Sequence, residues 1–188
     1  MEFHHLAEKI LFSTKQARSD TCTTILFLTT RLREPENDDW ENLVHLMKYI
    51  IRTRNPPLTL SFNGSRILKL WIDGSFAVHP NMRGHTGVGL STVRGFPIFS
   101  STKQKLNKRS STETVIVAVD DCIPAILWTR YWLDAQGYDI FENIIYQDNK
   151  NSIILENNSK APRSKCIYHI NIRYYFVTDC IERHEISP

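Results

Sequence analysis

Two short acidic motifs carry the chemistry that this sequence suggests most directly. They read WIDGS at 71–75 and IIYQDN at 144–149. In each motif an aspartate, Asp73 or Asp148, ends an apolar, strand-like run where the pattern turns polar. Two such acids on neighbouring strands can converge on one or two divalent cations, and their hard oxygen ligands suit Mg²⁺ or Mn²⁺. Taken singly, either aspartate is also typical of a turn or of a helix N-cap.

The histidines and cysteines do not have the sequence spacing of a zinc site. The four cysteines contain no CxxC pair, and none of His79, His85, His169 and His184 stands in an HxxxH pair. We therefore expect solvent-exposed or structural histidines and reduced, structural thiols in an intracellular protein. The sequence shows neither a signal peptide nor a long apolar span, so we expect no membrane partner.

Composition predicts one main domain with a helical appendage. The chain has 188 residues, of which 41% are hydrophobic, and a net charge of +3. A chain of this length and apolar content can bury one sizeable core. Because so small a net charge does not by itself indicate a nucleic-acid partner, such a partner must be argued from local clusters of charge.

Two basic runs without any acidic residue supply such clusters. The first contains Arg94, Lys103, Lys105, Lys108 and Arg109. The second contains Lys160, Arg163, Lys165 and Arg173. Both are predicted in loops or at helix starts near the sheet edge where the two aspartates emerge, so they could hold the phosphates of a duplex. Ordinary solvated loops are the alternative interpretation.

Residues 1–62 are predicted to form a helical segment. Apolar residues recur at helical spacing in 4–33, with a break near Arg18-Ser19-Asp20, and again in 40–51. Asn37 or Asp38 is the expected cap of the later helix. The dipeptide Pro56-Pro57 is expected to end it, because proline cannot donate a backbone hydrogen bond. We place the boundary of the segment near residue 62.

Residues 63–188 show the pattern of an α/β domain. The β-like pattern begins just before this range, with a predicted run at 58–62. Further β-like runs are predicted at 67–72, 86–93 and 96–100. Residues 112–133 revert to helical spacing, and Pro124 is expected to kink or shorten that helix. A strand at 143–146 follows, then helices at 149–156 and 164–180, and residues 185–188 have the pattern of an opening strand.

Four runs in this order make the pattern specific. They read WIDGSFAVHP at 71–80, SSTE at 110–113, YQDNKNSI at 146–153 and HINIRY at 169–174. Together they resemble the ribonuclease H region of copia-type retrotransposon polyproteins. The runs LFSTKQAR at 11–18 and EPENDDW at 34–40 resemble the connection segment that precedes it. The implied fold is a ribonuclease H-like mixed sheet with flanking helices, whose fifth strand and last helix are missing from this chain.

The resemblance implies hydrolysis of the RNA strand of an RNA·DNA hybrid with two Mg²⁺ or Mn²⁺ ions. Such ions activate a water and stabilise the departing 3′ oxygen. By this carry-over Asp73 would bridge the two metals, and Asp148 would bind the metal near the nucleophile. The resemblance also implies an upstream reverse transcriptase domain as a partner and no small-molecule cofactor.

This sequence departs from the family at two of its four acids. The family reads SSTEAE where residues 110–115 read SSTETV, so the second acid aligns with Val115. Glu113 stands two residues earlier, about 200° away around a helix, and could serve only if the helix starts late. Otherwise it is a helix N-terminal acid favoured by the dipole. The fourth acid follows the fifth strand, beyond Pro188, and Asp179 is a stand-in by composition alone.

Two acids are few for two dications, so we expect weak metal binding and little or no cleavage. A missing fifth strand would also leave one side of the strand at 143–146 unpaired. The alternative function is a non-catalytic module that binds RNA·DNA hybrids through basic loops. Its residues would be Lys103, Lys105, Lys108, Arg109, Arg163 and Lys165. A relic without function is a third possibility.

Overall fold

The computed structural model describes residues 2–55, 59–61, 64–157 and 168–188, without the side chains of 168–172 and 174. The chain begins with helix α1 (Glu2–Ala17), a 3₁₀ turn η1 (Ser19–Thr21) and helix α2 (Cys22–Thr29). The predicted break near residue 18 is thereby confirmed. The Arg18 guanidinium closes it, because it pairs with the Asp20 carboxylate at 2.8 Å and donates to the carbonyl oxygen of Thr53 at 2.9 Å.

The third helix differs from its prediction at its start. Helix α3 spans Asn37–Arg52. The residue before it, Glu36, is the cap, and its backbone N–H donates to the Asp39 carboxylate at 3.0 Å. The expected cap at Asn37 or Asp38 is therefore wrong, because Asp39 reaches back and fixes the helix start one residue earlier. The helix ends at Arg52, one residue after the predicted apolar run, and the two prolines lie outside the described residues.

Four strands form one mixed sheet, as the resemblance implied. They are β1 (Ile67–Ser75), β2 (Arg83–Ser91), β3 (Ile98–Asn107) and β4 (Glu142–Tyr146), in the spatial order β3-β2-β1-β4. The first three are antiparallel neighbours, and β4 runs parallel to β1. The predicted strand at 58–62 is not found: in its described part, Ser61 makes a single bridge to Arg94.

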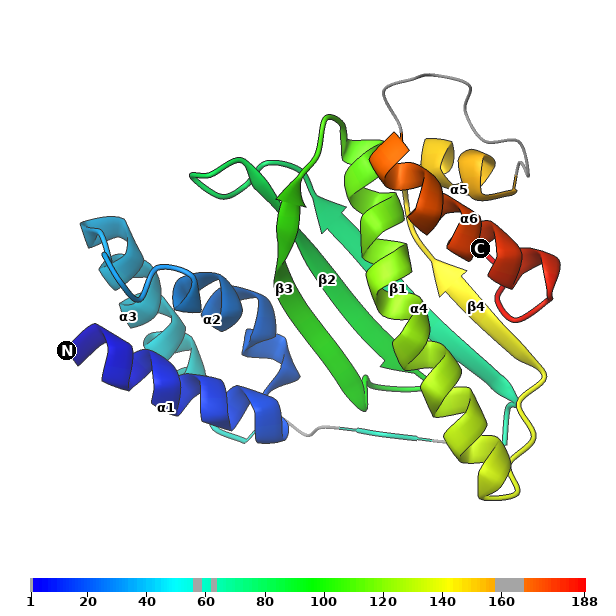
Figure 1. Ribbon diagram of the computed structural model, residues 1–188. Coiled ribbons are helices and arrows are strands. Elements are labelled where there is room, and N and C mark those ends of the chain that lie inside the picture. Colours follow the sequence, from blue (N-terminus) through cyan, green and yellow to red (C-terminus); the bar gives the residue numbers. More distant parts are fainter. Residues whose placement is uncertain (1, 56–58, 62–63, 158–167) are drawn as a thin grey trace.

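Three helices lie beside or across one face of this sheet (Figure 1). They are α4 (Ser111–Ala135), α5 (Lys150–Asn157) and α6 (Tyr168–Glu182). Helix α4 packs on the sheet and also contacts α5 and α6, so residues 114–119 are all buried. A helix that is apolar on every side needs cover on every side. Pro124 is exposed and does not shorten the helix, which continues unbroken to Ala135.

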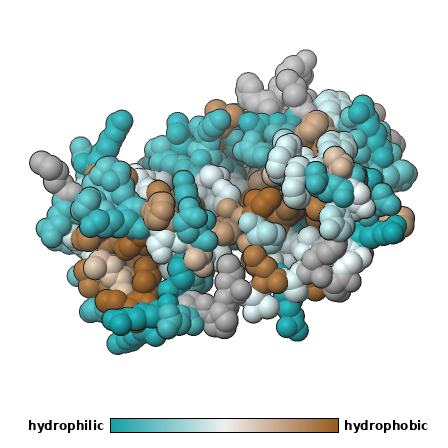
Figure 2. All heavy atoms as spheres, turned by 90° about the horizontal axis from the view of Figure 1, so that it is seen from below, coloured by the Kyte–Doolittle hydropathy of each residue, from teal (hydrophilic) through white to brown (hydrophobic). Residues whose placement is uncertain are grey.

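The apolar residues form two separate clusters. One joins the helices α1, α2 and α3 through Phe3, Ala7, Ile25, Leu28, Leu43 and Leu46. The other lies between α4 and the sheet and includes Leu68, Leu70, Ile72, Val115 and Val119. On the surface, Figure 2 shows apolar side chains over the helical segment and, separately, over the sheet part. The boundary near residue 62 stays a prediction, since residues 62 and 63 are not described.

The last described residues add to the sheet edge. Ile186 is buried in the main core, and Ser187 forms a parallel bridge with Ile144. The Ser187 N–H donates to Asn143, and its carbonyl accepts from Ile145, both at 2.7 Å. The residues expected to open a further strand thus make one isolated bridge to β4 and no further strand. Because of this bridge, the outer side of β4 is partly paired and not wholly open as expected.

Cys22, Cys122 and Cys180 are free thiols, and Cys166 lies outside the described residues. In the part of the chain that the structure describes, no helix has both the length and the apolar character needed to cross a membrane.

Candidate functional site

The pairing of β1 with β4 brings Asp73 and Asp148 side by side. Trp71 and Tyr146 are partners across the two parallel strands, and each aspartate follows its strand's partner residue by two positions. Neighbouring strands lie about 4.8 Å apart, so this register places the two carboxylates at one end of the sheet. Asp148 follows the end of β4 as predicted. Asp73 does not end its strand, because pairing with β2 carries β1 on to Ser75.

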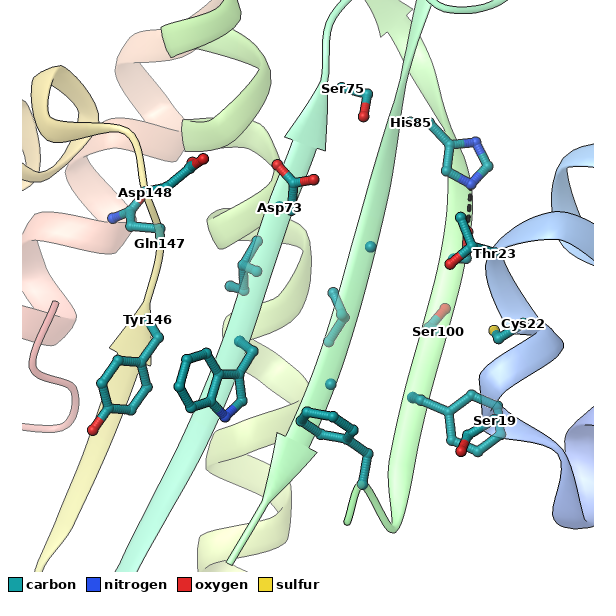
Figure 3. Close-up of a pocket in the computed structure, with 18 of the residues that line it drawn as sticks. Ser19, Cys22, Thr23, Asp73, Ser75, His85, Ser100, Tyr146, Gln147 and Asp148 are labelled. Carbon is teal, nitrogen blue, oxygen red and sulfur yellow. Dashed lines mark hydrogen bonds between the residues drawn. The ribbon is translucent and has the colours of Figure 1, made fainter. Parts of the chain in front are cut away.

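Both aspartates lie on the sheet face that α4 does not cover, which we call the open face. Leu68, Leu70 and Ile72 are buried against α4, so the alternate residues Trp71 and Asp73 point the other way. Figure 3 shows the carboxylates of Asp73 and Asp148 at the same end of this face.

A cleft of about 850 Å³ hollows the open face between β4 and α2. Its lining includes Asp20, Cys22, Thr23, Trp71, Asp73, Gly87, Gly89, Phe96, Phe99, Ser101, Tyr146, Gln147 and Asp148. The rings of Trp71 and Tyr146 stack with their centroids 4.2 Å apart and an interplanar angle of 14°. This contact joins β1 to β4 two residues before the acids, and it fixes the strand ends from which the acids project.

A buried carboxylate that sequence reasoning missed braces the residues around Asp148. Glu156 in α5 is 1% exposed and accepts hydrogen bonds from the Gln147 amide at 2.6 Å and the Ser152 hydroxyl at 2.8 Å. Burial raises the pKa of Glu156 to about 7, although both hydrogen bonds act to lower it. On the other side, the Asn149 side chain accepts the Ser152 N–H at 3.1 Å. Both neighbours of Asp148 are therefore tied to α5.

The remaining candidate acids lie elsewhere. Glu113 is already helical, since α4 begins at Ser111, and its carboxylate accepts the Arg109 N–H at 2.8 Å. Val115, at the expected acid position, is 3% exposed within the main core. Asp179 on α6 pairs with Arg183, the residue after that helix, at 3.0 Å. Among the described residues, no three acids, histidines or cysteines gather where they could hold a metal ion.

This donor set fits one hard divalent cation. Magnesium is commonly held by one or two carboxylates together with waters and substrate phosphates, which Asp73 and Asp148 could supply in part. A two-cation centre needs further carboxylates to bridge and flank the ions. Among the described residues no third acid, histidine or cysteine gathers with these two.

The basic residues predicted to bind nucleic acid differ in their positions and in their exposure. Lys103 lies on β3 opposite His85, beside the cleft. Lys105 follows on the same strand and is exposed, whereas Lys108 is half-buried and its pKa is lowered by desolvation and by Arg173. Arg173 itself is engaged by Asp120 at 3.4 Å and Asp121 at 3.1 Å. The predicted contacts Lys160, Arg163 and Lys165 lie outside the described residues.

Two histidines form a buried network that the sequence pattern did not reveal. His79 Nε2 lies 2.9 Å from His85 Nδ1, and His85 Nε2 lies 2.6 Å from the Ser101 hydroxyl, as the dashed line in Figure 3 marks. The His79 ring stacks on Phe27 of α2 with centroids 5.3 Å apart. Desolvation, aided by Lys103 and His85, lowers the pKa of His79 to about 4. This network joins β2, β3 and the loop after β1 to the helical segment.

Fold and site together define a mixed α/β sheet protein with an acid pair on adjacent parallel strands, covered by helices on one face. No model of a known protein family matches the chain. It is 25% identical over 181 residues, or 95% of its length, to the retrovirus-related Pol polyprotein from transposon TNT 1-94 of Nicotiana tabacum. This similarity confirms the resemblance to a retrotransposon polyprotein. The chain spans 13% of that protein's length.

A solved structure with a similar arrangement is that of LC11-RNase H1, isolated from compost by a metagenomic approach. The TM-score is 0.47 and the identity 11%, over 63% of this chain and 78% of that one.

Proposed function

We propose that this chain is the ribonuclease H-like segment of a retrotransposon polyprotein, and that it binds RNA·DNA hybrids with a metal centre reduced to Asp73 and Asp148. The observation that carries the proposal is the register of β1 and β4, which sets these two acids side by side. Similarity to a transposon Pol polyprotein over nearly the whole chain supports the polyprotein context.

The reduced centre predicts slow cleavage or none. A divalent cation held by Asp73 and Asp148 would supply charge stabilisation to a phosphodiester. Val115 offers only methyl groups at the position where the family has its second acid, and the Glu113 carboxylate is occupied by the Arg109 N–H. Asp73 and Asp148 can orient a phosphate through one bound cation. The further carboxylates that would hold a second cation are missing among the described residues.

Hybrid binding would rest on lysines of β3, across the sheet from the acid pair. Lys103 and Lys105 lie on β3, the outer strand of the sheet. Lysines that contact phosphates give binding that is independent of base sequence and weakens as salt rises.

The first experiment uses a hybrid with a labelled RNA strand, in Mg²⁺ and separately in Mn²⁺. We expect binding at low salt that weakens steeply with salt, and slow cleavage or none. Asp73→Asn should abolish any residual cleavage and leave hybrid binding intact. The double change Lys103→Gln and Lys105→Gln should weaken binding and reduce the salt dependence by roughly one charge per lost phosphate contact.

Lys48→Gln is the matched control, because Lys48 is exposed on α3 in the helical segment. It should bind the hybrid as the unchanged chain does. Rapid cleavage by the unchanged chain would contradict the reduced centre and would point to Glu113 as a further ligand. If the unchanged chain does not bind the hybrid at low salt, the proposal that it binds RNA·DNA hybrids is wrong.

A further inference from the structure

The floor of the cleft is bare backbone. Gly87 of β2 pairs with Asp73 on one side and with Ser101 on the other. A Cβ built on Gly87 would have a single neighbouring atom within reach, the Asp73 carbonyl oxygen at 4.0 Å. The strand therefore leaves open space on this face between the acid side and the hydroxyl side of the cleft.

Aromatic rings stand along the next row of the sheet. Gly89 pairs with Trp71 on β1 and with Phe99 on β3, and Tyr146 stacks on the far side of Trp71. Phe96 covers Gly89, because a ring carbon lies 2.6 Å from the place that a Cβ there would take. Trp71 is nevertheless 45% exposed and Phe96 is 39% exposed. Exposed rings on a sheet face are the surfaces on which nucleobases stack.

Polar groups surround this aromatic row in a fixed order. The carboxylates of Asp73 and Asp148 lie at one end of the open face, as Figure 3 shows. Ser101 of β3 and Thr23 of α2 lie across the cleft from these acids. The volume of about 850 Å³ is within the range of small-ligand sites. A base stacks on a side-chain ring when it is not paired with another base, so this row of rings suits an unpaired nucleotide.

We infer that this cleft binds an unpaired nucleotide of single-stranded nucleic acid, with the base against Trp71 and Phe96 and the phosphate beside Asp73 and Asp148. The inference rests on the proposed function, since the phosphate meets two carboxylates and needs the divalent cation that they would hold. Two bare carboxylates repel a phosphate, so binding in the cleft requires that cation. Hybrid binding through Lys103 and Lys105 has no such requirement.

The test is a titration of the full chain with an RNA octamer that carries one 2-aminopurine, in Mg²⁺ and separately in EDTA. We expect a change of 2-aminopurine fluorescence that requires Mg²⁺. Trp71→Leu should weaken binding by roughly tenfold, the loss of one stacked base. Gly87→Val should weaken it at least as much, since the valine side chain fills the floor. Trp128→Leu is the matched control, because Trp128 is 63% exposed on α4, outside the cleft.

Gly87→Val is suited to this test because it should fold. The position has open space and lies within a strand, where β-branched residues are favoured. Thermal unfolding followed by circular dichroism would verify that the variant is folded. A folded Gly87→Val protein that binds the octamer as well as the unchanged chain would overturn the inference.

The hybrid assay separates this inference from the proposed function. Loss of octamer binding in Gly87→Val with hybrid binding retained supports the cleft as a site for an unpaired nucleotide. Hybrid binding by the unchanged chain without octamer binding overturns the inference alone. If the octamer binds equally well in Mg²⁺ and in EDTA, the inferred role of Asp73 and Asp148 in octamer binding is wrong. If neither nucleic acid binds, the inference and the proposed function both fail.

Discussion

Glu156 shows how a single buried side chain braces one member of the acid pair, Asp148. Its carboxylate holds the Gln147 amide, and Gln147 immediately precedes Asp148. A buried carboxylate is costly when ionised unless its hydrogen bonds compensate. Here two donors reach it, yet burial still dominates and raises its pKa to about 7. The protonated form is therefore favoured by the fold.

This gives a prediction for stability against pH. Because the folded pKa lies above the ordinary value of 4.5, the stabilisation is fully present below pH 4.5 and is lost as pH rises to about 7. The loss should be on the order of 3 kcal/mol. Glu156→Gln cannot ionise, so urea unfolding between pH 4.5 and 7.5 should show a flatter profile for this variant.

Glu182→Gln serves as its control, since Glu182 is exposed on α6. It should keep the pH profile of the unchanged chain. Parallel profiles for the unchanged chain and Glu156→Gln would show that Glu156 does not change protonation on folding in this range.

At the scale of elements, α4 decides what chemistry the sheet can support. Its start at Ser111 places Thr114 against Gly74, with the threonine methyl 3.2 Å from the position of a Cβ on Gly74. The first turns of α4 thus lie beside the end of β1 that carries Asp73. Val115 belongs to this part of the helix but packs into the core. An acid there would begin close to the acid pair.

Val115→Glu tests that placement through stability. In EDTA, a buried and unpaired carboxylate should lower the free energy of unfolding by about 3 kcal/mol or more. Mn²⁺ or Mg²⁺ should restore part of this loss only if the start of α4 turns the new carboxylate around the end of β1 toward Asp73, which lies on the open face. Thermal unfolding with and without metal measures both effects.

Val119→Glu is the matched control, since Val119 is buried in the same core one helical turn, or about 6 Å, further along α4. It should be destabilised in EDTA, and metal should restore nothing. Equal responses of the two variants to metal would argue against a cation site within reach of residue 115.

At the scale of the whole molecule, two apolar clusters are joined through few polar contacts. His79, in the loop after β1, stacks on Phe27 of α2 and is 2% exposed. The same histidine contacts His85, which pairs with Ser101 on β3. A neutral, buried imidazole thus connects the helical segment with the open face of the sheet.

The connection should weaken in acid. The folded pKa of His79 is about 4, below its ordinary value of 6.5, so its stabilisation is present above pH 6.5 and is lost as pH falls to about 4. We expect a loss on the order of 3 kcal/mol in urea unfolding over that range. His79→Gln should be less stable at neutral pH and should show a flatter profile.

For this change the control is His45→Gln, because His45 is exposed on α3. Its acid profile should follow that of the unchanged chain. An unchanged acid profile in His79→Gln would assign the acid sensitivity to other groups.

The sequence by itself determined the order of the elements and the identity of the acid pair. Local spacing predicts helices and strands because burial of one face imposes a period on the chain, and Asp73 and Asp148 stand in motifs short enough to read locally. Local spacing gave the wrong element boundary where a residue elsewhere in the chain fixes that boundary. Pairing with β2 extends β1 past Asp73, and Asp39 fixes the start of α3.

Only the tertiary structure decided what surrounds the acids. The cleft combines Gly87, Trp71 and Phe96 with residues of α2, and the brace at Asp148 joins Gln147 to Glu156. Strand register and helix packing bring these residues together, and neither leaves a periodic trace in the sequence. Packing also commits Arg173 to Asp120 and Asp121, and buries Val115 where an acid was expected. The chemistry was readable from local residue types, but its environment depends on contacts between segments far apart in the chain.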